Sequence, residues 1–265
     1  MLFKSIAASL TGAVAALTLF AAAPASAETI KVGVTPGPHA QIMEEVKRLA
    51  EPKGLDIEIL EFSDYVVPNE ALNAGDLQAN SFQHKPYLDN QVADRGYQLT
   101  DVAFTVNFPI GVYSQKHKAI TDLPEGATVA IPNDPTNGGR VLLLLDDAGV
   151  LKLREDAGVK ASIADIVENP KKLKIVEIDA AQLPRSLPDV DAAGINTNYA
   201  KEAGLDPVKD PILRESPKGP YVNLIAVRTQ DKDAPWVKTL VETYNSDEVR
   251  KFVEDTFHGA VLAGW

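Results

Sequence analysis

Hydrophobic and polar positions alternate with two different periods in the chain that follows residue 27. Residues 29–34 and 55–62 alternate at every second position, which predicts two strands. Between them, residues 40–53 carry apolar side chains at helical spacing, which predicts a helix that ends at Gly54. A strand, a helix and a second strand over about 30 residues form a βαβ unit. The pattern therefore indicates a parallel sheet.

A second unit of this kind follows directly. A short helix is expected to begin behind Pro68 and to end at Gly75, because proline favours the first turn of a helix and glycine the position after its last. Residues 77–82 then read as a short strand. Another helix opens near Lys85 and runs to Gly96.

Aromatic and amide side chains gather where that strand meets the second helix. Ligands of open α/β sheets bind at the carboxyl ends of strands. Rings mixed with amides at this place indicate a pocket for a small, partly apolar molecule. Each residue alone would more often belong to the core or the surface, so the prediction depends on their number. The candidates are Tyr65, Phe82, His84 and Tyr87.

A break at Asn107-Phe108-Pro109 separates the first group of strands and helices from a second group that follows it. Predicted strands cover residues 99–106, 110–114, 127–132, 174–178, 190–195 and 221–228. Predicted helices cover residues 138–149, 163–167 and 181–187. An amphipathic helical region covers residues 236–257, and its helices would return to cover the first group. We therefore predict an α/β protein with a ligand cleft between two lobes. Residues 28–109 and 222–265 would form lobe I, and residues 110–221 would form lobe II.

Residues 1–27 are predicted to be a signal peptide. Lys4 gives a positive start, residues 6–23 are small and apolar, and Ala25-Ser26-Ala27 is a typical cleavage site. We expect cleavage after Ala27 and, in a Gram-negative envelope, export to the periplasm.

The composition excludes several classes of protein. The sequence has 265 residues, no cysteine and a formal net charge of −11. Without cysteine, a disulfide scaffold, a thiolate zinc site and a Cys-linked lipid anchor are excluded, so we expect a free periplasmic protein and not a Cys-anchored lipoprotein. The negative charge argues against nucleic acid or anionic lipid as a partner.

The segment Asn137-Gly138-Gly139-Arg140 could bind an anion. Backbone N–H groups at a helix start attract negative charge, and an arginine there offers a planar fork to a carboxylate. The segment lacks the ending of a phosphate-binding loop. An equally good interpretation is that Arg140 pairs with a nearby Asp on the surface.

Three asparagines, Asn196, Asn198 and Asn223, follow or lie in predicted strands. An amide can hold an ammonium and a carboxylate together, because it offers both a donor and an acceptor. A single asparagine at a strand end is more often a turn residue.

Familiar catalytic patterns are missing from the sequence. Its four histidines, His39, His84, His117 and His258, lack the spacing of metal ligands. We therefore expect a binding protein rather than an enzyme, with no metal and no cofactor.

Together these segments resemble the methionine-binding proteins of bacterial ABC importers, the NlpA/MetQ family. The resemblance spans the chain in order from residue 31 to residue 224. The matching segments are 31–34, 64–72, 82–88, 129–137, Arg140, 167–170, 182–185, 195–197 and 221–224.

The resemblance implies a type II periplasmic-binding-protein fold that captures free methionine, L-methionine above all, and delivers it to a permease in the inner membrane. It implies that Arg140 binds the ligand carboxylate, and that Asn196 and Asn223 hold the α-amino and carboxylate groups. The aromatic set of Tyr65, Phe82, His84 and Tyr87 would enclose the ligand side chain, and Asn137 and Asn198 are further candidates.

Three alternatives stay open at this stage. The same fold could bind D-methionine, a methionyl dipeptide or another small amino acid. A periplasmic enzyme could use His84 as an acid or base. An adhesive or structural secreted protein would bind no small ligand.

Overall fold

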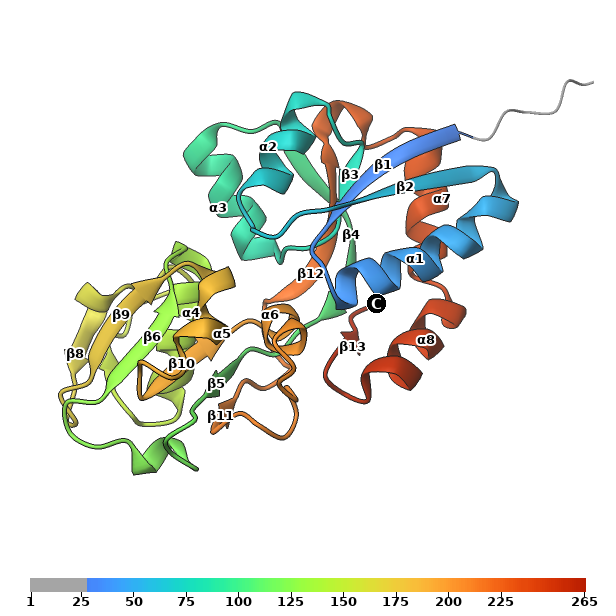
Figure 1. The fold of residues 1–265 in the computed structure, drawn as a ribbon. Coiled ribbons are helices and arrows are strands. Elements are labelled where there is room, and N and C mark those ends of the chain that lie inside the picture. Colours follow the sequence, from blue (N-terminus) through green and yellow to red (C-terminus); the bar gives the residue numbers. More distant parts are fainter. Residues whose placement is uncertain (1–27) are drawn as a thin grey trace, which may run out of the picture.

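The computed structural model describes residues 28–265, so the predicted signal peptide lies outside the described residues. Two sheets with helices on their faces form two lobes, the first in the upper half of Figure 1 and the second in the lower left. The fold is the predicted α/β architecture.

The first sheet has the strand order β13-β4-β12-β3-β1-β2. Strand β1 runs parallel to β2 and β3, and β12 runs antiparallel to β3 and β4. The strands are β1 (Glu28–Val34), β2 (Leu55–Glu61), β3 (Ala79–Asn80), β4 (Leu99–Asn107), β12 (Val222–Arg228) and β13 (Leu262–Ala263).

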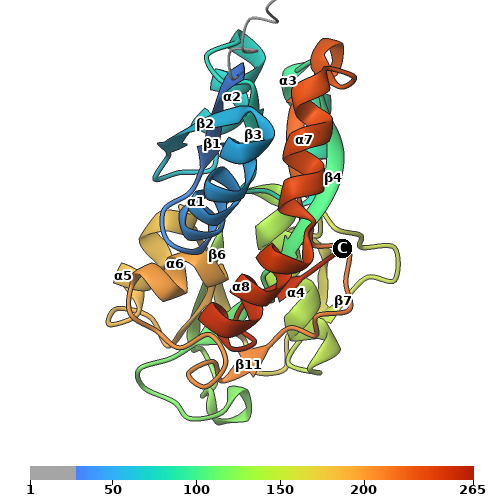
Figure 2. The same ribbon diagram turned by 90° about the vertical axis from the view of Figure 1, so that its right-hand side faces the viewer.

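Helices cover both faces of the first sheet because its strands are apolar on both sides. Along β12, Ile225 packs with α1, α7 and α8, whereas Leu224 packs toward α2 and α3. Figure 2 shows α7 and α8 beside α1, as expected for a C-terminal region that returns to the first lobe. The helices are α1 (Pro38–Ala50), α2 (Val67–Ala74), α3 (Lys85–Arg95), α7 (Pro235–Tyr244) and α8 (Asp247–Phe257).

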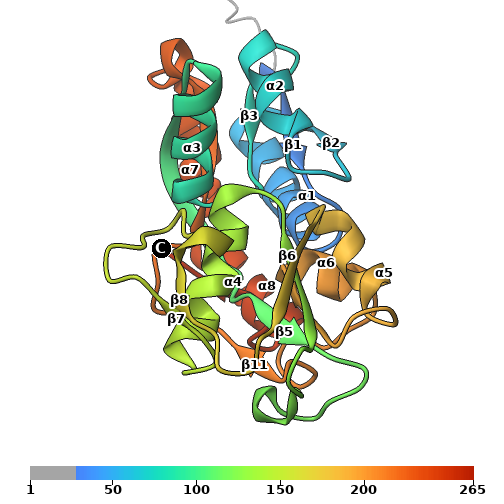
Figure 3. The ribbon, with the colours of Figure 1, turned by 90° about the vertical axis from the view of Figure 1, so that its left-hand side faces the viewer.

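The second sheet has the order β11-β5-β10-β6-β9 and is also covered on both faces. Val129 and Ile131 of β6 pack against α4, and Ala130 between them packs on the side of α5 and α6. Figure 3 shows this lobe from the left-hand side of Figure 1. Its elements are β5 (Gly111–Tyr113), β6 (Thr128–Pro132), α4 (Pro135–Asp147), β9 (Lys174–Ile178), α5 (Leu183–Ser186), β10 (Ala192–Ile195), α6 (Thr197–Glu202), β11 (Leu213–Arg214) and a small hairpin of β7 (Lys152–Leu153) and β8 (Ile166–Glu168).

Residues 107–111 and 214–222 connect the two sheets. The passages are tied together, since Asn107 Nδ2 donates to Pro217 O at 2.7 Å and Glu215 N donates to Ile110 O at 3.0 Å. We propose that the lobes are divided as the sequence predicts, into residues 28–109 with 222–265 and residues 110–221.

Some predicted elements have different limits. Helix α4 begins at Pro135 rather than Gly138, and residues 163–167 form a 3₁₀ turn followed by β8 instead of a helix. The C-terminal helical region is two helices, because Ser246 caps a new one by accepting from Val249 N at 3.3 Å. Among residues 28–265 no helix is both long and apolar enough to cross a membrane.

Candidate functional site

A cavity lies between the lobes. All nine side chains predicted as ligand contacts line it, together with three that were not predicted: His39, Gln83 and Phe108. Their convergence from both lobes makes this cavity the candidate site. The lining residues are His39, Tyr65, Phe82, Gln83, His84, Tyr87, Phe108, Asn137, Arg140, Asn196, Asn198 and Asn223.

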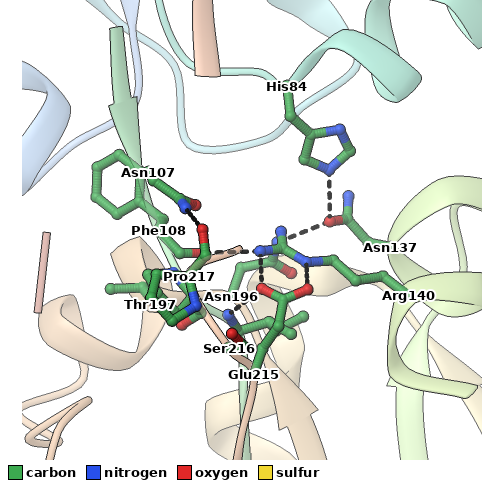
Figure 4. Close-up of polar contacts among 12 residues, drawn as sticks. His84, Asn107, Phe108, Asn137, Arg140, Asn196, Thr197, Glu215, Ser216 and Pro217 are labelled. Atoms are coloured by element: carbon green, nitrogen blue, oxygen red, sulfur yellow. Dashed lines mark hydrogen bonds and ion pairs between the residues drawn. The ribbon is translucent and has the colours of Figure 1, made fainter. Parts of the chain in front are cut away.

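His84 connects the two lobes as a neutral ring. It is the N-cap of α3, where its Nδ1 accepts a hydrogen bond from Tyr87 N at 3.2 Å. The proton therefore lies on Nε2, which donates to Asn137 Oδ1 of the other lobe at 3.1 Å (Figure 4). Burial, reinforced by the positive charge of Arg140, lowers the pKa of His84 to about 3.

Asn137 is the junction of the polar groups in the second lobe. Its Oδ1 also accepts from Asn196 Nδ2 at 2.9 Å, and its Nδ2 donates to the Asp134 carboxylate at 2.9 and 3.1 Å. The same carboxylate caps α4 by accepting from Asn137 N at 2.9 Å. The start of this helix is therefore occupied by the protein's own carboxylate, and the expectation that its free N–H groups bind an anion is wrong.

Arg140 lies in the second turn of α4 and is paired to a partly buried acid. Its Nε donates to Glu215 Oε1 at 2.8 Å, and its Nη2 donates to Glu215 Oε2 and, at 2.9 Å, to Phe108 O. The ring of Tyr221 covers the guanidinium plane at 4.2 Å. The acidic partner of Arg140 is therefore a partly buried glutamate and not an Asp on the surface (Figure 4). Arg140 also lines the cavity, and its binding of a ligand carboxylate stays a prediction.

Aromatic rings form the wall on the side of the first lobe. Tyr65 has its ring centroid 5.9 Å from that of Phe82 and 6.1 Å from that of Tyr87. Tyr65 Oη donates to Asn198 Oδ1 across the lobes at 2.6 Å, and beside it Tyr199 Oη donates to Ser63 O at 3.1 Å. These bonds hold the wall against the second lobe.

Two buried amide atoms in the cavity lining have no partner among residues 28–265. They are the acceptor Oδ1 of Asn196 and the donor Nδ2 of Asn198. A buried polar group without a hydrogen bond is unfavourable, so these atoms favour a ligand that brings both a donor and an acceptor.

His39 and Gln83 were missed although the rule that located His84 also applies to them. His39 follows β1 at the carboxyl end of a parallel strand, and its Nε2 accepts from Asn223 Nδ2 at 2.9 Å. Gln83 is held by a buried amide network, donating to Asn69 Oδ1 at 2.7 Å and Asn80 Oδ1 at 2.9 Å. Phe108 lies in the predicted break and stacks on His39 at 4.5 Å.

The buried histidines predict a loss of stability in mild acid. Burial lowers the pKa of both His39 and His84 from 6.5 to about 3. The unfolded chain therefore takes up these protons below pH 6.5 while the folded chain does not, and stability falls as the pH falls. Between pH 6.5 and 5.5 each histidine is expected to cost about 1 kcal/mol of stability.

Urea unfolding at pH 7.0 and 5.5 would measure this effect in the wild type and in His84→Asn, where asparagine still caps α3. We expect the variant to lose about half of the pH dependence. His258→Asn, at an exposed position, is the control and should behave as the wild type. Equal pH dependence in all three proteins would contradict the assignment to His84.

Known proteins resemble this chain over most of its length. A family model described as NlpA lipoprotein matches residues 30–265. The D-methionine-binding lipoprotein MetQ of Escherichia coli (strain K12) is 52% identical over 239 residues, which cover 89% of this chain and 88% of that protein.

Two solved structures are similar over the same region. One is a nutrient binding protein from Burkholderia cenocepacia bound to methionine, 55% identical with a TM-score of 0.87, covering 89% of this chain and 100% of that one. The other is an ABC transporter periplasmic substrate-binding protein from Coxiella burnetii, 47% identical with a TM-score of 0.85, also covering 89% and 100%.

The names of these relatives overturn one prediction. The family model and the Escherichia coli relative are both described as lipoproteins, which contradicts a free periplasmic protein without a lipid anchor. That prediction relied on the cleavage site before residue 28 and on the absence of cysteine.

Proposed function

The chain belongs to the NlpA lipoprotein family, as its motifs predicted, and we propose that it is the substrate-binding protein of an ABC importer, with free methionine as its substrate. The observation that carries this proposal is the convergence of one arginine, several amides and a wall of aromatic rings on one cavity between two lobes. These groups match the carboxylate, the ammonium and the apolar side chain of an amino acid. The relatives described as methionine-binding support the choice of methionine.

We assign the carboxylate of the ligand to Arg140. Its Nε and Nη2 are occupied by Glu215 and Phe108, so Nη1 is the nitrogen left for the cavity. Asn196 and Asn223 would hold the α-amino and carboxylate groups. Asn196 would accept from the ammonium, since its Oδ1 is buried and unpaired within the described chain, and Asn198 would donate to the carboxylate.

Tyr65, Phe82, His84 and Tyr87 would enclose the thioether side chain. Contacts between sulfur and aromatic rings are worth about 0.3–1.5 kcal/mol each. His84 suits an uncharged side chain because the ring itself is neutral and both of its nitrogens are already bonded. Asn137 would act indirectly, as the group that holds His84 and Asn196 in place.

The same bonds make His84 a poor acid or base. A general base needs a pKa near the working pH and a free nitrogen facing the substrate, whereas the pKa of His84 is lowered to about 3 and Tyr87 N occupies its Nδ1. We therefore do not favour an enzyme at this site, in agreement with relatives described as substrate-binding proteins.

The ligand would stabilise the closed form by contacting both lobes. Arg140 and Asn196 belong to the second lobe and the aromatic wall to the first, so bound methionine gains its full contacts only when the lobes meet. We propose that an inner-membrane permease recognises this closed form and receives the ligand.

We propose L-methionine as the preferred enantiomer. The carboxylate, ammonium and side-chain contacts would fix three directions around the ligand's α-carbon, so the two enantiomers cannot bind equally well. The name of the Escherichia coli relative makes D-methionine the first competitor to test.

Titration calorimetry tests the proposal on protein that has been unfolded and refolded to remove bound ligand. We expect one-to-one binding of L-methionine with a dissociation constant of about 1 μM or lower, a free energy near −8 kcal/mol. Tighter binding of D-methionine or a methionyl dipeptide would retain the importer function and change the substrate. An absence of binding to any amino acid or short peptide would overturn the proposal.

A further inference from the structure

Glu215 lies where the two passages between the lobes meet the candidate site. It directly follows β11, and its backbone N–H donates to Ile110 O at 3.0 Å in the other passage. Its Oε2 also accepts from Ile110 N at 3.2 Å. The carboxylate is therefore held in place from the passage between β4 and β5, independently of Arg140.

This fixed carboxylate determines how Arg140 presents its guanidinium. Glu215 bonds to both Nε and Nη2, and such a bidentate pair sets the direction of the guanidinium fork as well as its plane. Phe108 O takes the other hydrogen of Nη2, and Tyr221 covers one face of the plane. Within the described chain, Nη1 has no protein partner, and it belongs to a side chain that lines the cavity.

Glu215 also determines the charge that the site offers. Arg140 is the one charged side chain among the twelve that line the cavity, because His39 and His84 are buried neutral rings. With Glu215 behind it, the arginine contributes no net charge to the site. A zwitterionic amino acid leaves this balance unchanged, whereas an anion of the same shape would add an uncompensated negative charge in a region of low dielectric constant.

We propose that Glu215 is a positioning residue that directs the Nη1 edge of Arg140 at the ligand carboxylate and makes the site selective for zwitterionic amino acids over the corresponding 2-hydroxy acids. This inference rests on the proposed function. It adds a second property, discrimination against a ligand in which the ammonium is replaced by a hydroxyl group.

The test compares two ligands of nearly equal size, L-methionine and 2-hydroxy-4-(methylthio)butanoate of the same configuration. Calorimetry would give the dissociation constants of both for the wild type and for Glu215→Gln. We expect the wild type to prefer methionine. In the variant, methionine should bind about tenfold more weakly, whereas the affinity for the hydroxy acid should fall only slightly or rise. The ratio of the two dissociation constants should therefore change by about tenfold in favour of the hydroxy acid.

Glu45→Gln is the matched control. Glu45 forms the same kind of bidentate pair with Arg48 on α1, at 2.7 and 2.9 Å, but Arg48 is exposed and lies outside the cavity lining. We expect this variant to keep both affinities and the preference of the wild type.

Glu215→Asp separates charge from geometry and remains available if Glu215→Gln does not fold. It keeps the negative charge but shortens the side chain, so we expect both ligands to bind more weakly while the preference for methionine is retained. The inference would be overturned if Glu215→Gln lost the same factor of affinity for both ligands. It would also be overturned if Glu215→Asp reduced the preference for methionine as much as Glu215→Gln does. Wild-type protein that binds neither ligand would overturn the proposed function and this inference with it.

Discussion

Replacing Arg140 with alanine is expected to weaken methionine binding by roughly 100-fold, or about 3 kcal/mol. The change removes the one positively charged group in the lining of the cavity and with it the charge-assisted hydrogen bonds to the ligand carboxylate. Calorimetry at constant pH and salt would measure the loss.

The structure adds a second effect that the sequence alone does not predict. Arg140→Ala leaves the carboxylate of Glu215 without its partner, at a position where that side chain is only 15% exposed. Removing one member of a buried ion pair costs about 3–5 kcal/mol of stability, and we expect somewhat less because Ile110 N still bonds to the carboxylate.

A double variant distinguishes the two effects. Arg140→Ala combined with Glu215→Gln removes the unpaired charge, so it should recover much of the melting temperature but none of the methionine affinity. Arg48→Ala, which breaks a comparable surface pair, is the control and should change neither quantity measurably. Wild-type affinity in Arg140→Ala would contradict the assignment of the carboxylate.

The order of strands and helices could largely be predicted because it depends on local patterns. The alternation in residues 29–34 and the helical spacing after residue 40 correspond to β1 and α1. The aromatic residues near His84 could be found because the carboxyl end of a strand and a helix start come from the same stretch of sequence.

The partners of the site residues could not be predicted, because they come from distant parts of the chain. Glu215 is 75 residues from Arg140, and the bond from Asn223 to His39 spans 184 residues. No periodic pattern indicates such pairs. The capping of α4 by Asp134 was missed for a different reason: the two glycines after Asn137 resemble a loop, and they concealed a helix that starts at Pro135.

These glycines lie inside α4 because the helix packs closely against backbone. A Cβ atom built on Gly139 would lie 2.8 Å from Ala161 N, 2.8 Å from Val159 O and 2.9 Å from Ala161 O. All three neighbours are backbone atoms, which cannot move aside as the end of a side chain can. Glycine destabilises a helix by about 1 kcal/mol relative to alanine. Its presence here therefore indicates that the lack of space for a side chain, and not helix propensity, determines the residue at this position.

Gly139→Ala is therefore expected to destabilise the protein by about 2–3 kcal/mol, since the strain of the overpacked contact exceeds the gain in helix propensity. For a chain of this size the melting temperature should fall by roughly 4–12 °C. The binding of methionine should weaken as well, because Asn137 and Arg140 are carried by the same helix. Thermal unfolding and calorimetry would measure the two effects.

Gly158→Ala is the control in the facing loop, where an added Cβ meets no atom within 4 Å, and it should be neutral or slightly stabilising. Equal melting temperatures for the two variants would show that α4 can shift to admit the added methyl group, and would contradict the prediction that close packing requires glycine here.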